Sequence, residues 1–412
     1  MSAAMLPGGP VDVLIVGGGI FGCSIAWHCA RLGVGRVVVL ERDTLAFAAT
    51  SRAAALMTRA RAKPALMPLV AQTYADLPAL EEEIGESLDL RRVGSLHIAG
   101  SAARRQGLRE LAALAETGGL SVEWLAADEA ARRAPWLDPE AILAAAFMPE
   151  DGFIDPYRLA MAYARAARAR GAILLQGIAV RSLRRQGERV TGAATAQGAI
   201  EAGCVVDAAG AWSALLASSL GIGLPLAPVR SQYWITAPDP QFPPDHAIVI
   251  LPDVGAYSRP ELGGLLFGLR EARSASYDAR QLPPDLSGFP LGEEGGWPSL
   301  IEGAPALRHF LPALDRLEIA HHIAGLSTYT PDALPVLGPA PETAGFLAAS
   351  GCSGAGIALA GGVGASIAAL AANRARPFDV TPFRLERFGP INPFSPAFRR
   401  ACEQARSSKV TG

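Results

Sequence analysis

The sequence has little of several features that would assign it to a particular class of protein. Its 412 residues include only five cysteines, and these do not have the spacing of metal ligands. Acidic and basic residues nearly balance, with a net charge of −2, and no basic stripe is present. We therefore expect no metal, no nucleic-acid partner, and reduced thiols as in a cytoplasmic protein.

Long hydrophobic runs are also missing, although 50% of the residues are hydrophobic. The first ten residues, MSAAMLPGGP, have no basic region before an apolar one, so we expect no signal peptide. Segment 11–30 is the best candidate for a membrane span, but Asp12, His28 and several glycines interrupt it. We expect a cytoplasmic chain without a membrane span, long enough for two or more domains.

Segment 11–42, VDVLIVGGGIFGCSIAWHCARLGVGRVVVLER, combines two apolar runs with a cluster of glycines. VDVLIV predicts a strand buried on both faces, Cys23–Leu32 predicts a helix, and RVVVLER predicts a second buried strand. The turn between the first strand and the helix fits the pattern G-x-G-x-x-G. Its residues are Gly17, Gly19, Ile20, Phe21 and Gly22.

Each glycine of this pattern has a physical role. Gly17 permits a tight turn, Gly19 lets a pyrophosphate approach the backbone, and Gly22 allows close packing of helix on strand. Glu41 follows Gly22 by 19 positions and, next to Arg42, lies where an acidic residue binds ribose hydroxyls. The order of strand, turn, helix, strand and acid predicts a dinucleotide site, with a purely structural glycine turn as the alternative.

A second glycine-rich turn, Gly351–Gly356, precedes a predicted helix at 357–373. Gly354, Ala355, Gly356 and Ile357 are expected to contact a cofactor, because the N–H groups at a helix start favour negative charge. The alternative is a helix cap with close packing. Two such turns in one chain suit a cofactor with two ends.

Four blocks of the sequence resemble the D-amino-acid-oxidase-like FAD-dependent oxidoreductases, in their sarcosine, dimethylglycine and glycine oxidase or dehydrogenase branch. The first is the glycine segment with the Thr-, Ser- and Arg-containing stretch 45–69 that follows it. The others are GFIDPYRLAMAYARAARARGA at 152–172, VVDAAGAWSALLASSLG at 205–221, and the C-terminal glycine block, 324–371. The resemblance implies an α/β fold, with a Rossmann-like FAD-binding domain and a second α+β substrate domain built on an antiparallel sheet.

The expected FAD-binding domain is discontinuous and comprises residues 1–85, 150–225 and 318–375. The substrate domain comprises 86–149 and 226–317, and 376–412 form a C-terminal extension. Strand-like alternation at 230–237, 246–252, 255–261 and 264–269 predicts the antiparallel sheet. We expect a surface loop at 281–298 and a disordered tail after Lys409.

The resemblance implies noncovalent FAD, held also by residues outside the glycine turns. These are Thr50, Ser51, Arg52, Val180, Ala209, Gly210, Trp212 and Gly325.

The sequence departs from the known members of the family at several positions. Ser327 stands where glycine and D-amino acid oxidases have an Arg for the substrate carboxylate, and Ala358 where monomeric sarcosine oxidase has a Lys. Gly325 and Arg52 replace the Cys and the His that attach flavin covalently in relatives, and Ser231 replaces an active-site His. Covalent flavin is therefore not expected, and the substrate specificity of these relatives does not transfer.

Tyr257 and Arg259 are the candidate catalytic residues. They match a Tyr-x-Arg strand of the family and share one face of a strand, where a hydroxyl can steer an amine and a guanidinium can hold a carboxylate. Arg52 and Arg59 are rival carboxylate binders, and a solvated edge-strand Arg is the structural alternative. Adjacent His321 and His322 would point to opposite faces and cannot form one site.

The expected activity is oxidation of a small secondary or N-methylated amine, or of an amino or imino acid. Hydride passes to flavin N5, and the resulting imine is hydrolysed. One alternative is the FAD subunit of a multi-subunit amino acid dehydrogenase, which would need a partner subunit. The other is a flavin-binding protein without turnover. A homo-oligomer is also compatible with the sequence.

Overall fold

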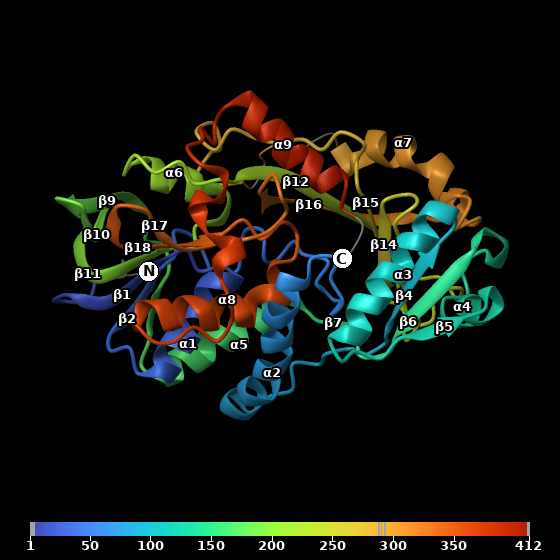
Figure 1. The fold of residues 1–412 in the computed structure, drawn as a ribbon, viewed down its shortest axis with the longest axis horizontal. Helices are drawn as coiled ribbons and strands as arrows, with labels where there is room; N and C mark the ends of the chain where they lie inside the picture. The colour runs from blue at the N-terminus through green and yellow to red at the C-terminus, as the bar shows by residue number, and fades with distance from the viewer. Residues whose placement is uncertain (1–4, 287–288, 290, 292–293, 410–412) are drawn as a thin grey trace.

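The computed structural model describes residues 5–286, 289, 291 and 294–409. Within them, most strands belong to two large sheets in an elongated molecule, and long helices pack below the first sheet in the view of Figure 1. The predicted α/β class is confirmed. The first sheet has a parallel core, and the second is largely antiparallel.

The parallel core of the first sheet contains β18, β11, β1, β2 and β8 in that order, while β17, β10 and β9 extend it by antiparallel pairing. These strands are β1 Val11–Val16, β2 Val37–Leu40, β8 Ile173–Leu175, β9 Val180–Gln186, β10 Arg189–Thr195, β11 Gly198–Asp207, β17 Val336–Ala340 and β18 Thr343–Ser350.

Four helices pack together on one face of this sheet, and a short one, α6 (Ser213–Ser218), lies near its other face (Figure 1). The four are α1 Ile20–Leu32, α2 Met67–Ile84, α5 Pro156–Ala169 and α8 Gly356–Ala371. Helix α1 begins three residues earlier than predicted, because the end of the glycine pattern forms its first turn. A Cβ on Gly22 would lie 1.9 Å from the carbonyl oxygen of Gly17, so only glycine fits there.

Helix α8 approaches α1 and α2 more closely than side chains would normally allow. A Cβ on Gly362 would lie 2.2 Å from the Cα of Leu69 in α2, and one on Gly364 would lie 2.2 Å from Ser24 Oγ in α1. The Ser24 hydroxyl donates to the carbonyl of Ala360 at 2.8 Å. The glycines of α8 therefore fix its position, and with it the turn that precedes the helix.

The second sheet has the strand order β16-β12-β15-β14-β13-β4-β6-β5. All neighbours pair antiparallel except β13 and β4. The strands are β4 Ser95–Ala99, β5 Glu123–Leu125, β6 Ala144–Met148, β12 Ala227–Thr236, β13 Ile248–Leu251, β14 Ala256–Glu261, β15 Gly264–Leu269 and β16 Ile319–Tyr329. Helices α3 Ala102–Thr117, α4 Ala127–Arg133 and α7 Trp297–Leu307 accompany it.

The four strands predicted in 230–269 are confirmed as β12 to β15. The structure differs at one domain boundary, because β16 pairs along its length with β12 and so belongs to the second sheet, although the prediction gave 318–375 to the FAD-binding domain. Its alternating pattern predicts a strand but does not specify the sheet.

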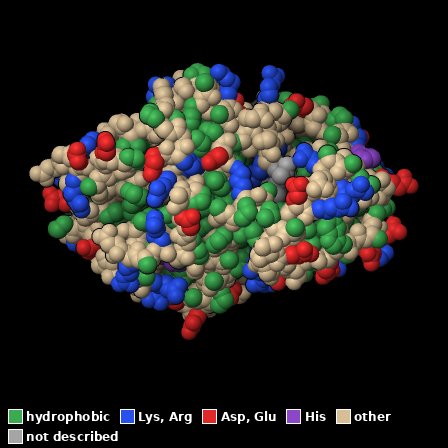
Figure 2. Space-filling view, in the orientation of Figure 1, with side chains coloured by type: hydrophobic (Ala, Val, Ile, Leu, Met, Phe, Trp, Pro, Cys, Tyr) green, Lys and Arg blue, Asp and Glu red, His purple; other side chains and the backbone are tan. Residues whose placement is uncertain are grey.

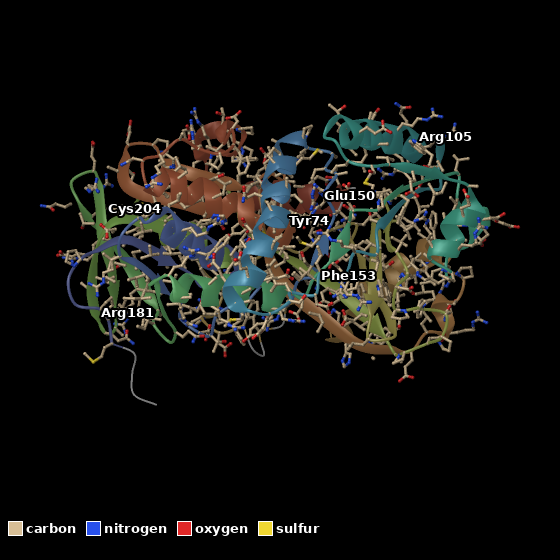
Figure 3. All side chains as sticks on the ribbon, turned by 90° about the horizontal axis from the view of Figure 1, so that it is seen from below. Tyr74, Arg105, Glu150, Phe153, Arg181 and Cys204 are labelled. Atoms are coloured by element: carbon tan, nitrogen blue, oxygen red, sulfur yellow. The ribbon has the colours of Figure 1, made fainter. Side chains whose placement is uncertain are left out.

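The two parts of the chain meet at a small two-stranded sheet of β3 (Leu56–Met57) and β7 (Gly152–Phe153). Figure 3 places Tyr74, Glu150 and Phe153 in the middle of the molecule, beside this sheet. The Tyr74 hydroxyl donates to the carbonyl of Met57. Arg59, a predicted rival for the substrate carboxylate, instead pairs with Glu150 at 2.7 Å.

Helix α9 (Pro396–Ser407) crosses β12 and β16 on the upper side of the molecule in Figure 1. Pro396 occupies its first turn, and Ser395 caps it by accepting from Phe398 N. The predicted loop 281–298 lies partly outside the described residues, and its end at Trp297 begins α7. The predicted tail after Lys409 lies outside them altogether.

None of the helices in the described ranges is both long and apolar enough to cross a membrane. Among the same residues, no group of three or more His, Cys, Asp or Glu side chains is arranged to hold a metal ion. On the face in Figure 2, acidic and basic side chains are interspersed, and no continuous basic band crosses it.

Candidate active site

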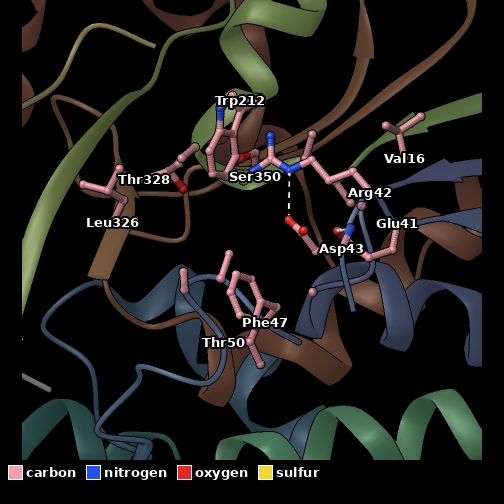
Figure 4. Close-up of a pocket in the computed structure, with 18 of the residues that line it drawn as sticks. Val16, Glu41, Arg42, Asp43, Phe47, Thr50, Trp212, Leu326, Thr328 and Ser350 are labelled. Carbon is pink, nitrogen blue, oxygen red and sulfur yellow. Dashed lines mark hydrogen bonds and ion pairs between the residues drawn. The ribbon is translucent and has the colours of Figure 1, made fainter. Parts of the chain in front are cut away.

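A cleft of about 480 Å³ lies at the carboxyl ends of the parallel strands, where ligands bind in open α/β sheets (Figure 4). One end is formed by the residues after β2 and β11, and the other by β16 and the turn before α8. Its lining is mostly apolar, and its charged residues are Glu41, Arg42, Asp43, Arg52 and Arg181. This shape suits an elongated ligand with two different ends.

The start of α1 faces this cleft. Gly17 has φ +108°, and a Cβ there would lie 2.4 Å from the carbonyl oxygen of Ala208. The Thr50 hydroxyl accepts from Ile20 N at 3.0 Å, so a residue 30 positions away caps the helix. Gly19, Ile20 and Phe21 line the cleft, and the first-turn N–H groups form an anion site there.

The Glu41 carboxylate accepts from Gly18 N at 2.7 Å and from Asp43 N at 2.9 Å. It therefore holds the glycine turn in place while still lining the cleft. Arg42 pairs with Asp43 at 3.4 Å (Figure 4), and its guanidinium lies over the Trp212 ring at 3.5 Å. At this end of the cleft, the carboxylates of Glu41 and Asp43 can accept hydrogen bonds from hydroxyls of a ligand. They lie beside the Trp212 indole, over which the Arg42 guanidinium stacks.

The turn before α8 is held by hydroxyls of β16. Ser327 Oγ accepts from Gly354 N at 3.1 Å, and Thr328 Oγ1 accepts from Gly351 N at 3.1 Å. Ser327, Thr328, Cys352 and Gly356 all line the cleft. The start of α8 is therefore fixed against β16 at the end of the cleft opposite Glu41.

Two buried polar atoms of the lining lack a hydrogen-bond partner within the described part of the chain. They are Trp212 Nε1 and Ser350 Oγ. A buried donor without a partner is costly, and a polar ligand in the cleft would satisfy both atoms. The two glycine turns, the Glu41 carboxylate and these atoms fit a dinucleotide that contains an adenosine end and a polar ring end.

A family model described as FAD dependent oxidoreductase matches residues 12–370. The chain belongs to this family. The resemblance inferred from the sequence is confirmed, and FAD is the cofactor of this family.

Relatives of this oxidoreductase include the mitochondrial dimethylglycine dehydrogenase of Rattus norvegicus. It is 31% identical over 386 residues, which are 92% of this chain and 45% of the relative. The glycine oxidase of Geobacillus kaustophilus is 30% identical, over 91% of this chain and 97% of the relative. The chain therefore spans less than half the length of the dimethylglycine dehydrogenase. Because such relatives include mitochondrial proteins, the cytoplasmic location stays a prediction.

Solved structures have the same fold. The crystal structure of the Geobacillus kaustophilus glycine oxidase has a TM-score of 0.77 at 30% identity, covering 91% of this chain and 98% of the other. That of L-proline dehydrogenase from P. horikoshii has a TM-score of 0.81 at 25% identity, covering 93% and 98%.

Most of the predicted FAD-binding residues of this oxidoreductase line one cleft. They are Gly17, Gly19, Ile20, Phe21, Glu41, Arg42, Thr50, Arg52, Val180, Ala209, Gly210, Trp212, Gly325 and Gly356. The lining does not include Gly22, Ser51, Gly354, Ala355 or Ile357. Gly22 serves packing instead, and the exposed Ser51 hydroxyl donates to the carbonyl of Phe47 at 2.7 Å.

Arg52 is fastened to its own loop, because its guanidinium donates to the carbonyls of Phe47 and Ala48 at 2.8 and 3.0 Å. Its Cβ lies 3.1 Å from where a Cβ of Gly325 would be. A larger residue at 325 would therefore press on Arg52. This pairing explains the glycine at a position where a relative has a flavin-attaching Cys.

The predicted catalytic pair on β14 lies outside the cleft lining, and its two members differ. Arg259 is buried, and its Nε donates to the carbonyl of Ala54 at 2.7 Å. It also pairs with Glu261 and lies over the Phe153 ring at 4.6 Å. Arg259 was predicted to bind a carboxylate. Its guanidinium is instead bonded to Ala54, which links β14 to the segment before β3.

Tyr257, the other predicted catalytic residue, is half-buried on β14. Its ring packs against Gly268, where a Cβ would lie 2.2 Å from the ring, so the neighbouring strand sets its position. Burial raises the pKa of the Tyr257 hydroxyl, although Arg270 and Arg406 lower it. The hydroxyl therefore stays protonated and can donate. His322 lies elsewhere, next to Gln232 at 3.0 Å, and His321 is exposed, so the two do not share a site.

Sequence reasoning did not identify a group of basic side chains drawn from three distant segments. Arg270 and Arg406 lower the pKa of Tyr257, and both of them, with Arg61, lower the pKa of Lys409, which follows Arg406 by three positions. One signal was present in the sequence. Of its 37 basic residues, only Lys63 and Lys409 are lysines.

Replacing Gly17 with Ala is expected to weaken FAD binding at least about tenfold, because the new Cβ would meet Ala208 O and an unfavourable φ. The ratio of flavin to protein absorbance after reconstitution measures this. Gly107→Ala on α3, where a Cβ has open space, is the control and should keep full flavin content. Equal flavin content in the two variants would contradict the assignment.

Asp207 ends β11 beneath the lining residue Ala208, and burial raises its pKa to about 7. The folded protein therefore binds a proton that the unfolded chain releases near pH 4, so stability falls as the pH rises from about 4 to 7. Asp207→Asn keeps an acceptor for Ala209 N, and its gain in thermal stability over the wild type should be larger at pH 8 than at pH 5. Thermal midpoints at both pH values test this against Asp128→Asn, an exposed site on α4. A pH-independent difference would contradict it.

Proposed function

We propose that this protein oxidises a small secondary or N-methylated amine, or an amino or imino acid, at a carbon–nitrogen bond, with noncovalently bound FAD as the hydride acceptor. The observation that carries the proposal is the cleft itself. It holds two fixed glycine turns at opposite ends and lies beneath β16 of the second sheet. Similarity to a dimethylglycine dehydrogenase and a glycine oxidase supports the substrate class.

When bound, FAD supplies the two-electron acceptor for the amine. The chain's own contribution begins with α8, whose N-terminus directs the positive end of its dipole at the cleft and favours negative charge there. Ser327 and Thr328 hold that helix start in position through the turn amides. The role proposed for these hydroxyls is therefore positioning.

Water is kept from the other side of the cleft by apolar side chains. Leu282, Pro284, Leu286 and Leu291 belong to the segment between β15 and α7 and line the cleft opposite the first sheet. A dry site strengthens every polar contact that orients a substrate. The proposed role of Tyr257 is to donate to the substrate from such a site.

The function is tested by an anaerobic visible spectrum of the flavin-loaded protein with pooled N-methyl, cyclic and D-amino acids. We expect the flavin band to bleach, and splitting the pool then identifies the substrate. A band that persists with every member of the pool would contradict the proposal and favour a flavin-binding protein without turnover. Catalytic oxygen consumption by the chain alone would count against the alternative of a dehydrogenase subunit that needs a partner.

Tyr257→Phe removes one hydroxyl and keeps the ring that packs on Gly268. We expect it to lower the rate of anaerobic flavin reduction by the identified substrate about tenfold, as the loss of one buried hydrogen bond to the substrate would. Tyr157→Phe, at a side chain that is half exposed, is the matched control. If both variants reduce as fast as the wild type, Tyr257 has no such role.

A further inference from the structure

Segment 396–409 lies beyond the residues that match the family, yet it is anchored firmly over the second sheet. Glu403 accepts from Ser276 N at 3.0 Å, and Arg406 donates to Glu271 at 2.7 Å and to Ser274 at 2.9 Å. Cys402 is fully buried against β12 and β16. These contacts hold the end of α9, and the residues that follow it, in a fixed place.

Lys409, which follows α9, contacts the glycine-rich turn before α8. Lys409 Nζ donates to the carbonyl of Ser353 at 3.1 Å and lies 3.5 Å from where a Cβ of Gly354 would be. The next residues on either side of this pair, Cys352 and Ala355, belong to the same turn, and Cys352 lines the cleft. The ammonium group is therefore close to the end of the cleft where the ring of the cofactor would lie.

The charges around Lys409 are mainly of its own sign. Burial, followed by Arg270, Arg61 and Arg406, lowers the pKa of its ammonium, and the Cys352 thiol raises it. Glu271, the acid that pairs with Arg406, also accepts from Arg230 and Gln232. A partly buried cation among cations is costly unless an anion joins it.

Other candidate binders are committed to other contacts. Ser327 has no charge and holds Gly354, Arg52 bonds loop carbonyls, and Arg259 bonds Ala54 and Glu261. An ammonium has three N–H donors, and Ser353 accepts only one of them. Among the described residues, Lys409 thus retains donors for a ligand.

We propose that Lys409 binds the carboxylate of the substrate at the flavin, with Arg270 and Arg61 adding to the positive field. The charge that relatives place at the position of Ser327 or of Ala358 comes here from segment 396–409. The inference rests on the proposed function and names its substrate class, an amine that carries a carboxylate.

The experiment is a titration of the flavin-loaded protein with acetate and with pyrrole-2-carboxylate, monitored by the change in the visible flavin band. These probes carry a carboxylate but no oxidisable amine. Neutral pyrrole is the probe without charge. We expect both carboxylates, and not pyrrole, to perturb the wild-type band.

Lys409→Gln keeps a donor for Ser353 and removes the charge, and it should raise the Kd of both carboxylates at least about tenfold. Lys409→Met, which removes the donor as well, should do the same. Lys63→Met, at the only other lysine, is the matched control and should bind as the wild type does. Flavin content, measured in each variant, should remain that of the wild type in Lys409→Gln.

The outcomes separate this inference from the proposed function. A Kd in Lys409→Gln within twofold of the wild type overturns the inference, as does a wild-type band that neither carboxylate perturbs while amines still bleach it. Carboxylate binding that depends on Lys409, in a protein that no amine in the pool reduces, would support the anion site and contradict the proposed oxidation.

Discussion

The cleft depends on backbone contact between α8 and the helices beneath the first sheet. Glycines at 362 and 364 let α8 lie against Leu69 and Ser24 at distances that no side chain would permit. Thr73 secures the same contact by donating to the carbonyl of Ala358 at 2.7 Å and accepting from Gly361 N at 2.9 Å. Since α8 cannot shift, the turn before it is fixed relative to the start of α1, and the distance between the two helix N-termini is set by packing.

β16 transmits that position to the second sheet. Its first half pairs with β12 near Trp234, and its second half presents Ser327 and Thr328 to the turn before α8. One strand therefore forms both part of the roof and part of the cofactor cleft. A hydroxyl at 327 is short enough to hold the turn, whereas a long charged side chain there would extend toward the ligand. A serine at 327 in place of an arginine therefore holds the turn before α8 and leaves β16 without a charge at this position.

Local sequence patterns were sufficient to predict much of the fold and the residues at one end of the cleft. The apolar run before Gly17, the glycine spacing and Glu41 are all within one βαβ unit, so sequence order alone predicts their arrangement. The same reasoning found the strands at 230–269. It did not place β16 in its sheet, because alternation reports burial and not the pairing partner. Nor did it show that Arg259 would be committed to Ala54, a contact across 205 positions.

The group of basic side chains around Lys409 was the least predictable part, because it is assembled from segments that no motif links. Arg61 follows β3, Arg270 follows β15, Arg406 lies near the end of α9, and Lys409 comes just after that helix. In the sequence, none of these four residues belongs to a motif. The fold brings them close enough to interact electrostatically. A positive field at this place also disfavours the ammonium form of a bound amine, which must lose its proton before it can be oxidised. Recruiting charge from segment 396–409 would therefore serve binding and reactivity together, without altering the strand that holds the turn.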